Sequence, residues 1–323
     1  MTMAHIQNLG IKGSNSKYSQ KGAALILLVF MVALIFTTFL IRATTGVEYR
    51  VSNDLKTAKA LVEAKSALLG WSVLQSDPGK LPCPEDTSLI GFATEGQAQP
   101  SCVLPAIGRL PWRTLGIGDI RDGNNDKLWY VVSNGFRTAP INVNTSAQLS
   151  VNGIPNSAVA IIFSSGTPLG TQSRPTPTSS TPPDISQYLD LVNNNGTGSF
   201  VTTGGATVFN DRLMVITKTE LFSLVTQRVL REVRGDSSQG LVKYYADVHL
   251  YPYADTDNNG YAEILQNSGT PSYQGGTDSL FFSTSIKNTL SNNGWYPLIA
   301  YQVSPGRQSV SLTLDTKTIV VTP

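Results

Sequence analysis

The fold depends on the stretch KGAALILLVF at residues 21–30. It opens an apolar run, Ala23 to Ile41, that contains no charged residue, proline or glycine. About 20 consecutive apolar residues are enough to cross a bilayer as an α-helix. The sequence therefore predicts a transmembrane helix over residues 23–41.

The helical pattern continues beyond this run. Between Val51 and Trp71 apolar residues recur mostly at three- and four-residue spacing, and no proline interrupts the chain before Pro78. We therefore expect one helix from about Ala23 to about Leu74. Its second half, residues 42–75, is expected to be amphipathic and to carry a globular head on one face.

The polar leader, the glycine and the apolar run directly after it resemble the processing signal of type IV prepilins and of type II secretion pseudopilins. The resemblance implies that a prepilin peptidase removes residues 1–22 by cutting after Gly22, and that the new terminal residue, Ala23, is methylated. It implies other pilin or pseudopilin subunits and inner-membrane lipid as partners. The implied location is the cell inner membrane, single-pass, with the head in the periplasm or, in a pilus, outside the cell.

Two features differ from the main subunits of that family. The family usually has glutamate at mature position 5, where this chain has Leu27. The head is also large, and bulky heads crowd a packed filament. Both features resemble the K-type minor pseudopilin, which caps the tip. The resemblance implies a non-catalytic minor subunit at or near the tip of a type IV pilus or type II secretion pseudopilus.

Two alternatives stay open. The first is a signal-anchored periplasmic or surface adhesin that never enters a filament, and it differs from the pilin interpretation in how the chain is processed at Gly22. The second is an anchored extracellular enzyme. No Gly-x-Ser-x-Gly or His-Glu-x-x-His motif supports it, and a catalytic triad would depend on His249 alone. We expect His249 to be structural, in a strand near residues 247–251, and the protein not to be an enzyme.

Composition favours an exported, β-rich protein. Charged residues make up 14% of the chain, against about 25% in typical soluble domains. The formal net charge is +2 and no basic block occurs, so we expect no nucleic-acid partner. The two cysteines, Cys83 and Cys102, lie in one proline-flanked loop, which predicts a disulfide formed in an oxidising compartment. Two free thiols in a cytosolic protein are the alternative.

The expected fold class is α+β and pilin-like, in which a long N-terminal transmembrane and amphipathic helix precedes an antiparallel β-sheet head with an inserted helical segment. Residues 76–163 should hold the disulfide loop and the first strands, near 127–132, 148–151 and 158–163. Residues 164–184 form a Pro/Ser/Thr-rich loop, and 185–323 make up the remainder of the head.

Within this remainder, residues 213–216 are expected to form a strand. The capping-box pattern Thr217-x-x-Glu220 opens a helix that ends at Gly235. Further strands are expected near 295–303, 308–314 and 318–321.

Residues 255–263, DTDNNGYAE, match the first part of an EF-hand-type calcium loop, in which alternate residues direct oxygens inward and a glycine permits the sharp turn. Several pseudopilin heads bind calcium. The predicted metal ligands are Asp255, Asp257, Asn259, Tyr261 through its backbone carbonyl, and Glu263. Position 12 departs from the pattern, because Gln266 replaces the usual glutamate. A polar turn without an ion is the alternative, and Asp119, Asp122 and Asp126 form a less specific second candidate.

Overall fold

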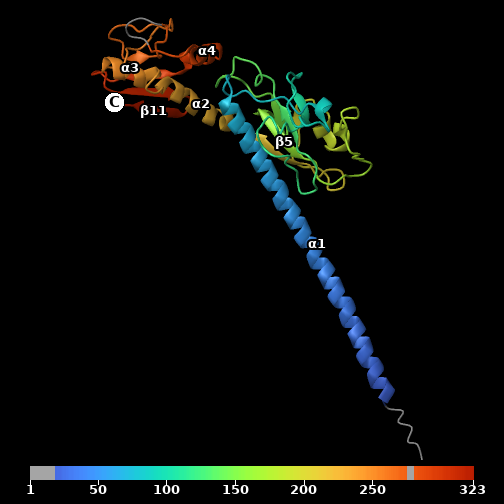
Figure 1. Ribbon diagram of the computed structural model, residues 1–323. Coiled ribbons are helices and arrows are strands. Elements are labelled where there is room, and N and C mark those ends of the chain that lie inside the picture. Colours follow the sequence, from blue (N-terminus) through green and yellow to red (C-terminus); the bar gives the residue numbers. More distant parts are fainter. Residues whose placement is uncertain (1–18, 275–279) are drawn as a thin grey trace, which may run out of the picture. The chain divides into compact units, whose positions relative to one another are not determined.

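The computed structural model describes residues 19–274 and 280–323; within the first helix it describes the side chains of residues 28–38 and from Arg50 onward (Figure 1). The chain divides into two units, Met1–Ser52 and Asn53–Pro323. The first helix, α1 (Ser19–Leu74), runs through both and ends at the residue that the apolar spacing predicts. The predicted continuous helix is thus confirmed.

The predicted transmembrane helix is wrong, and so is the pilin-like fold class that depends on it. Among the residues that the structure describes, no helix combines the length and the apolar character needed to cross a bilayer.

The head is built on a four-stranded antiparallel sheet with strand order β1-β2-β5-β7. The strands are β1 (Ala106–Arg109), β2 (Trp129–Val132), β5 (Ala160–Ser164) and β7 (Arg212–Ile216). The last three lie in or overlap the ranges predicted from β-branched and aromatic content. β1 lies in the segment predicted as loop, and it completes the sheet by pairing Ala106 with Val132 and Arg109 with Trp129.

This sheet is buried on both faces, which explains the unbroken apolar sequence of β2 and β5. Side chains alternate between the two faces of a strand. Tyr130 and Val132 therefore belong to one core, which also contains Leu68 of α1, whereas Trp129 and Val131 belong to a second core. β5 divides in the same way.

The carboxyl-terminal part of α1 contributes Ala60, Leu61, Ala64 and Leu68 to the first core. Thr57, Ala60, Leu61, Ala64 and Leu68 are all buried and follow the helical three- and four-residue spacing.

A nearby turn also approaches α1 closely. The amide of Gly123 donates to Thr57 Oγ1 at 2.9 Å. A Cβ at Gly123 would lie 2.2 Å from the Asn53 carbonyl oxygen, so only glycine fits this contact.

Two further sheets show that the prediction of one antiparallel sheet is wrong. The second sheet has the order β4-β3-β6, and β3 and β6 pair in parallel. The third has the order β11-β10-β9-β8 and is antiparallel. Their strands are β3 (Leu149–Val151), β4 (Ile154–Ala158), β6 (Ser199–Phe200), β8 (Ser268–Gly269), β9 (Ala300–Val303), β10 (Val310–Leu314) and β11 (Lys317–Val321).

Helix α2 (Lys218–Arg234) packs on β10 and β11 of the third sheet (Figure 1). The predicted capping box is confirmed, because Thr217 and Glu220 each accept the backbone N–H of the other residue. Arg228 of α2 donates to the carbonyl oxygens of Val73 and Gln75, where α1 ends. Cations commonly satisfy helix C-terminal carbonyls in this way.

The remaining helices are α3 (Gly240–Val248) and α4 (Thr284–Asn292), with short 3₁₀ turns at Thr87–Leu89, Ile185–Gln187, Leu191–Asn194 and Tyr296–Leu298. The expectation of a strand near residues 247–251 is wrong, because Asp247 and Val248 end α3. His249 follows in the left-handed conformation that closes many helices.

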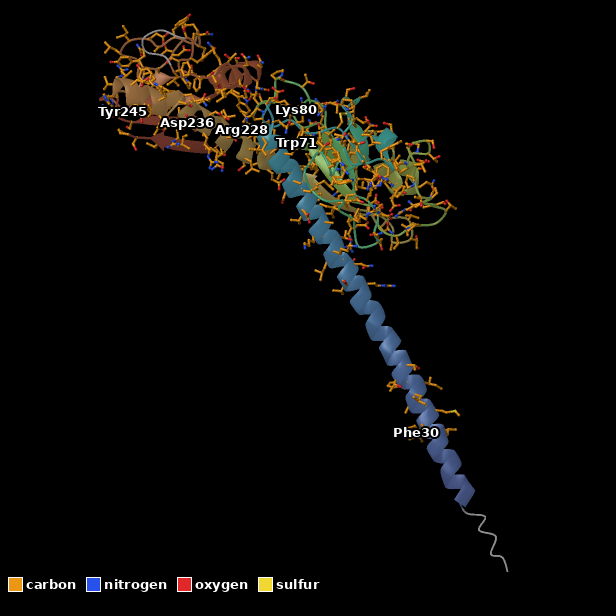
Figure 2. All side chains as sticks on the ribbon, in the orientation of Figure 1. Phe30, Trp71, Lys80, Arg228, Asp236 and Tyr245 are labelled. Atoms are coloured by element: carbon orange, nitrogen blue, oxygen red, sulfur yellow. A yellow bond between two sulfur atoms is a disulfide. The ribbon has the colours of Figure 1, made fainter. Side chains whose placement is uncertain are left out.

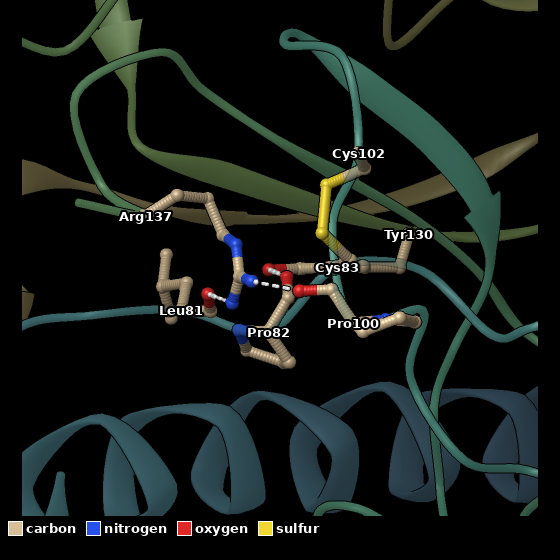
Figure 3. Close-up of a disulfide and its surroundings, with 7 residues drawn as sticks. All are labelled: Leu81, Pro82, Cys83, Pro100, Cys102, Tyr130 and Arg137. Carbon is tan, nitrogen blue, oxygen red and sulfur yellow. Dashed lines mark hydrogen bonds between the residues drawn. A yellow bond between two sulfur atoms is a disulfide. The ribbon is translucent and has the colours of Figure 1, made fainter.

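The predicted disulfide is confirmed. Cys83 and Cys102 are bonded across a sequence separation of 19 residues (Figure 3). Arg137 lies beside the bond and donates to the carbonyls of Leu81 (2.9 Å) and Pro100 (3.3 Å), so that one side chain joins the segment just before Cys83 to the segment just before Cys102.

The Pro/Ser/Thr-rich segment, residues 164–184, contains no helix or strand beyond the end of β5, as its composition predicts. Polar contacts hold it instead. Arg174 donates to backbone carbonyls of Gly166 and Gln187 and pairs with Asp126 at 2.5 Å. The buried guanidinium of Arg174 thus holds this segment through side-chain hydrogen bonds, where a helix or strand would use backbone hydrogen bonds.

Asp211 makes buried polar contacts with the turn that follows this segment. Its Oδ2 accepts the backbone N–H of Asp190 and the side-chain amide of Asn193, both at 2.9 Å. Its Oδ1 is buried without a hydrogen-bond partner among the described residues. Burial, reinforced by the charge of Asp190, raises the pKa of Asp211 to about 7.

We predict that the disulfide stabilises the head by about 3 kcal/mol, because closing a loop of about 20 residues restricts the unfolded chain. A reducing agent should lower the urea midpoint of the natural chain and leave that of the Cys83→Ala/Cys102→Ala double variant unchanged. Equal midpoints for the natural chain with and without reductant would contradict this.

We also predict that Asp211 makes stability fall as pH rises from about 4 to about 7. Its folded-state pKa lies above the ordinary 3.8, so the folded chain binds more protons than the unfolded chain in this window. The stabilisation is complete below the ordinary pKa and is lost as pH passes 7. Asp211→Asn should flatten this part of the pH profile of thermal unfolding, whereas Asp247→Asn, at an exposed position, should not. An unchanged slope in Asp211→Asn would refute the prediction.

Candidate metal centre

The candidate site is a closed loop over residues 255–270, which follows α3 and includes β8. An isolated β-bridge joins its ends, where Asp255 N–H donates to the Thr270 carbonyl at 2.9 Å and Thr270 N–H donates back at 2.7 Å. The loop is therefore fixed by backbone pairing and lacks the two flanking helices of an EF-hand.

Three carboxylates converge in this loop. One side-chain oxygen each from Asp255, Asp257 and Glu263 lies within 4.8 Å of the other two. Asp255 is fully buried, Glu263 is partly buried and Asp257 is exposed. The difference in exposure places the Asp255 ligand at the base of the site and leaves the side of Asp257 open to solvent. The three oxygens could hold a metal ion.

Local hydrogen bonds orient the carboxylates. Asp255 Oδ2 accepts the amide of Gly260 at 2.6 Å, and Glu263 Oε2 accepts the amide of Thr256 at 2.6 Å. Gly260 has a φ of 91°, and a Cβ there would lie 2.1 Å from Gln274 Cγ. The glycine that the sequence pattern requires at position 6 is thus also required by packing.

The electrostatics of the loop favour a cation. Asp255 Oδ1 is buried and has no hydrogen-bond partner among the described residues. Burial raises the pKa of Asp255, and the charges of Glu263 and Asp257 raise it further, against the lowering effect of hydrogen bonds from Gly260 and Asn258. A bound cation would relieve both effects, because it pairs with the buried oxygen and neutralises the mutual repulsion.

The other predicted ligands are placed less directly. Asn259 uses its Oδ1 to accept the Tyr261 amide at 2.8 Å, so both residues are held in the turn, and their role as ligands stays a prediction. Gln266 is exposed, and its backbone pairs with Glu263 and Ala254 instead of completing the site.

The second candidate, formed by Asp119, Asp122 and Asp126, is committed to other contacts. Asp119 pairs with Arg121 at 2.6 Å and Asp126 pairs with Arg174. Asp122 is buried and accepts the Ser164 hydroxyl at 2.7 Å. These carboxylates therefore hold the turn before β2 in place.

A cavity of about 220 Å³ adjoins the loop and was not expected from the sequence. Asp255, Tyr273 and Tyr296 line it, and the two tyrosine rings stack with centroids 3.7 Å apart. Residues this far apart along the chain meet only through tertiary folding, so no local pattern could have indicated the cavity.

The other residues singled out in the sequence are placed as follows. Gly22 and Ala23 both fall within α1, and processing between them stays a prediction. His249 contacts Tyr245 edge-on at 6.2 Å between ring centroids, and its carbonyl accepts Gln308 Nε2.

Comparison with protein-family models, curated proteins and solved structures finds no match for the chain.

We predict that divalent cations stabilise the head through this loop. A ligand that binds only the folded state at 100 times its Kd adds about 2.7 kcal/mol, so the unfolding midpoint should rise on titration. Asp257→Ala should abolish the rise. Asp247→Ala, at another exposed aspartate, is the matched control and should respond like the natural chain. A rise that survives in Asp257→Ala would place the ion elsewhere.

Proposed function

We propose that this chain is a non-catalytic minor subunit of a filament of the type IV pilus or type II secretion pseudopilus kind. One observation carries the proposal. Between Leu28 and Phe36 of α1, eight large apolar side chains are each 57–68% exposed. Figure 2 shows Phe30 as one of the side chains that stand out from this part of the helix.

These side chains require a covering surface. They are Leu28, Val29, Phe30, Met31, Val32, Leu34, Ile35 and Phe36. Because they are nearly consecutive, they occupy every face of the helix. A helix that is apolar all round is stable only where neighbours surround it, and exposed patches of this kind mark interaction sites. Helices of adjacent subunits in a filament would surround this segment on all sides.

One sequence feature supports a filament over other assemblies. Cleavage after Gly22 would start the mature chain at Ala23, inside α1, which frees the apolar end of the helix for packing. We favour a position at or near the tip because Leu27 replaces the glutamate expected of main subunits, and because the head beyond α1, residues 76–323, is large. The disulfide in the head is consistent with an oxidising compartment.

We further propose that the ion of the candidate metal centre is calcium. Every predicted ligand is an oxygen, and Ca²⁺ accepts flexible, many-oxygen coordination, whereas Mg²⁺ demands nearly ideal octahedral geometry. Without the glutamate of position 12, affinity in the millimolar to micromolar range is expected. In the cation titration described above, calcium should raise the unfolding midpoint, and magnesium should raise it much less.

We predict that α1 contacts other subunits through residues 28–36. Both natural cysteines are in the disulfide, so an introduced cysteine is the only free thiol. In the producing cell, Leu34→Cys labelled with a thiol-reactive photo-cross-linker, whose other end inserts into neighbouring C–H bonds on illumination, should become joined to another subunit, seen as an increased mass.

Val320→Cys, also exposed but on β11, serves as the control and should remain uncross-linked. If Leu34→Cys behaves like Val320→Cys, the filament proposal fails, and an adhesin that acts outside a filament becomes the better account.

A further inference from the structure

The cavity of about 220 Å³ beside the metal loop, residues 255–270, is lined by two sets of residues. The loop itself contributes Asp255, Asn258 and Thr270. The residues outside the loop are Tyr273, Leu290, Ser291, Gly294, Tyr296 and Pro297. Asp255 is thus both a carboxylate of the acidic triad and a part of the cavity lining.

The loop does not complete the coordination of a calcium ion by itself. Ca²⁺ takes about six to eight oxygen ligands, whereas the triad brings one oxygen each from three carboxylates together. The Asn259 side-chain oxygen already accepts the Tyr261 amide, and Gln266 does not complete the site. The remaining oxygens must therefore come from solvent or from a bound molecule.

The charges around the cavity favour neutral oxygens for this role. Three carboxylates and one divalent cation leave one net negative charge, so a phosphate or a carboxylate would be repelled. No lysine or arginine is among the described residues that line the cavity. Lys287 lies over the Tyr273 ring, 5.9 Å from its centroid, but is not part of the lining.

Tyr296 provides a second polar group that lacks a partner. It is only 2% exposed, and its hydroxyl is buried without a hydrogen-bond partner among the described residues. Burial raises the pKa of Tyr296, so the hydroxyl stays protonated and can both donate and accept. A buried hydroxyl without a partner is costly, and a ligand hydroxyl would remove that cost.

We propose that this cavity binds one ring of a neutral saccharide, two adjacent hydroxyls of which complete the coordination of the calcium ion. The inference rests on the calcium centre proposed above. A further hydroxyl of the same ring pairs with Tyr296, and Leu290 and Pro297 contact the C–H groups of the ring. The volume lies below the range of about 300–1,000 Å³ that is typical of drug-sized ligands, which limits the ligand to about one ring.

The test is isothermal titration calorimetry of the full chain with methyl α-mannoside and methyl α-galactoside, which differ in the orientation of their adjacent hydroxyls. At least one of them should bind with one site per chain in calcium. Removal of calcium with a chelator should weaken this binding at least about 10-fold. Tetrahydropyranyl methanol, a ring of the same size without adjacent hydroxyls, should also bind at least about 10-fold more weakly.

Three results would overturn the proposal: no binding of either glycoside in calcium, binding that is unchanged or stronger after calcium is removed, or equal binding of tetrahydropyranyl methanol. Failure of the saccharide can be told from failure of the ion. If calcium raises the unfolding midpoint but neither glycoside binds, the calcium centre stands and this inference fails. If calcium does not raise the midpoint, both fail.

Variants locate the saccharide in the cavity. Ser291→Phe, at an exposed lining position on α4, should fill the cavity and abolish glycoside binding, while calcium still raises the unfolding midpoint. Asn292→Phe is the matched control, because Asn292 is the next residue of α4, exposed and outside the lining, and it should bind like the natural chain.

Tyr296→Phe removes only the hydroxyl that lacks a partner and should weaken glycoside binding about 3- to 10-fold, the value of one hydrogen bond. Its response to calcium should be unchanged. Unchanged glycoside affinity in Ser291→Phe, or in a folded Tyr296→Phe, would refute the proposal.

Discussion

The head depends on the burial of both faces of β2 and β5. One face of these strands packs with the apolar side chains of the carboxyl-terminal part of α1 and with the core that α2 shares, and the other packs with β3, β6 and the turn around Tyr188. A sheet with both faces covered needs separate layers on each side. The second sheet and the turn around Tyr188 provide one layer, and the helices provide the other.

The sequence predicted those parts of the fold that local pattern determines. The end of α1, the capping box of α2 and strands β2, β7 and β10 follow from spacing and residue type within a few positions.

Sheet membership does not, because it depends on pairing between distant segments. β8 is only Ser268-Gly269 and has no strand signal of its own. β4 did have one: Asn152-Gly153, with φ of 52° and 76°, is the Asn-Gly hairpin turn between β3 and β4. The transmembrane prediction took the absence of charged residues over residues 23–41 as sufficient evidence for a membrane-spanning helix.

The candidate metal centre follows the same rule. The acidic triad comes from nine consecutive residues, so the alternate spacing of its oxygen-bearing side chains is enough to indicate it. The cavity beside it joins Asp255 to Tyr273 and Tyr296, which meet only in the folded chain, so the sequence does not indicate the cavity. The buried Asp255 Oδ1, which has no hydrogen-bond partner among the described residues, likewise becomes apparent only in the structure.

The proposed role in a filament rests on an apolar stretch of α1 that the chain itself leaves uncovered, and on a cleavage that would place that stretch at the mature terminus. The mass of the mature amino-terminal peptide, measured on protein purified from the producing cell, tests this most directly. The account predicts a chain that begins at Ala23. A chain that begins at Met1, or at any residue other than Ala23, would contradict it.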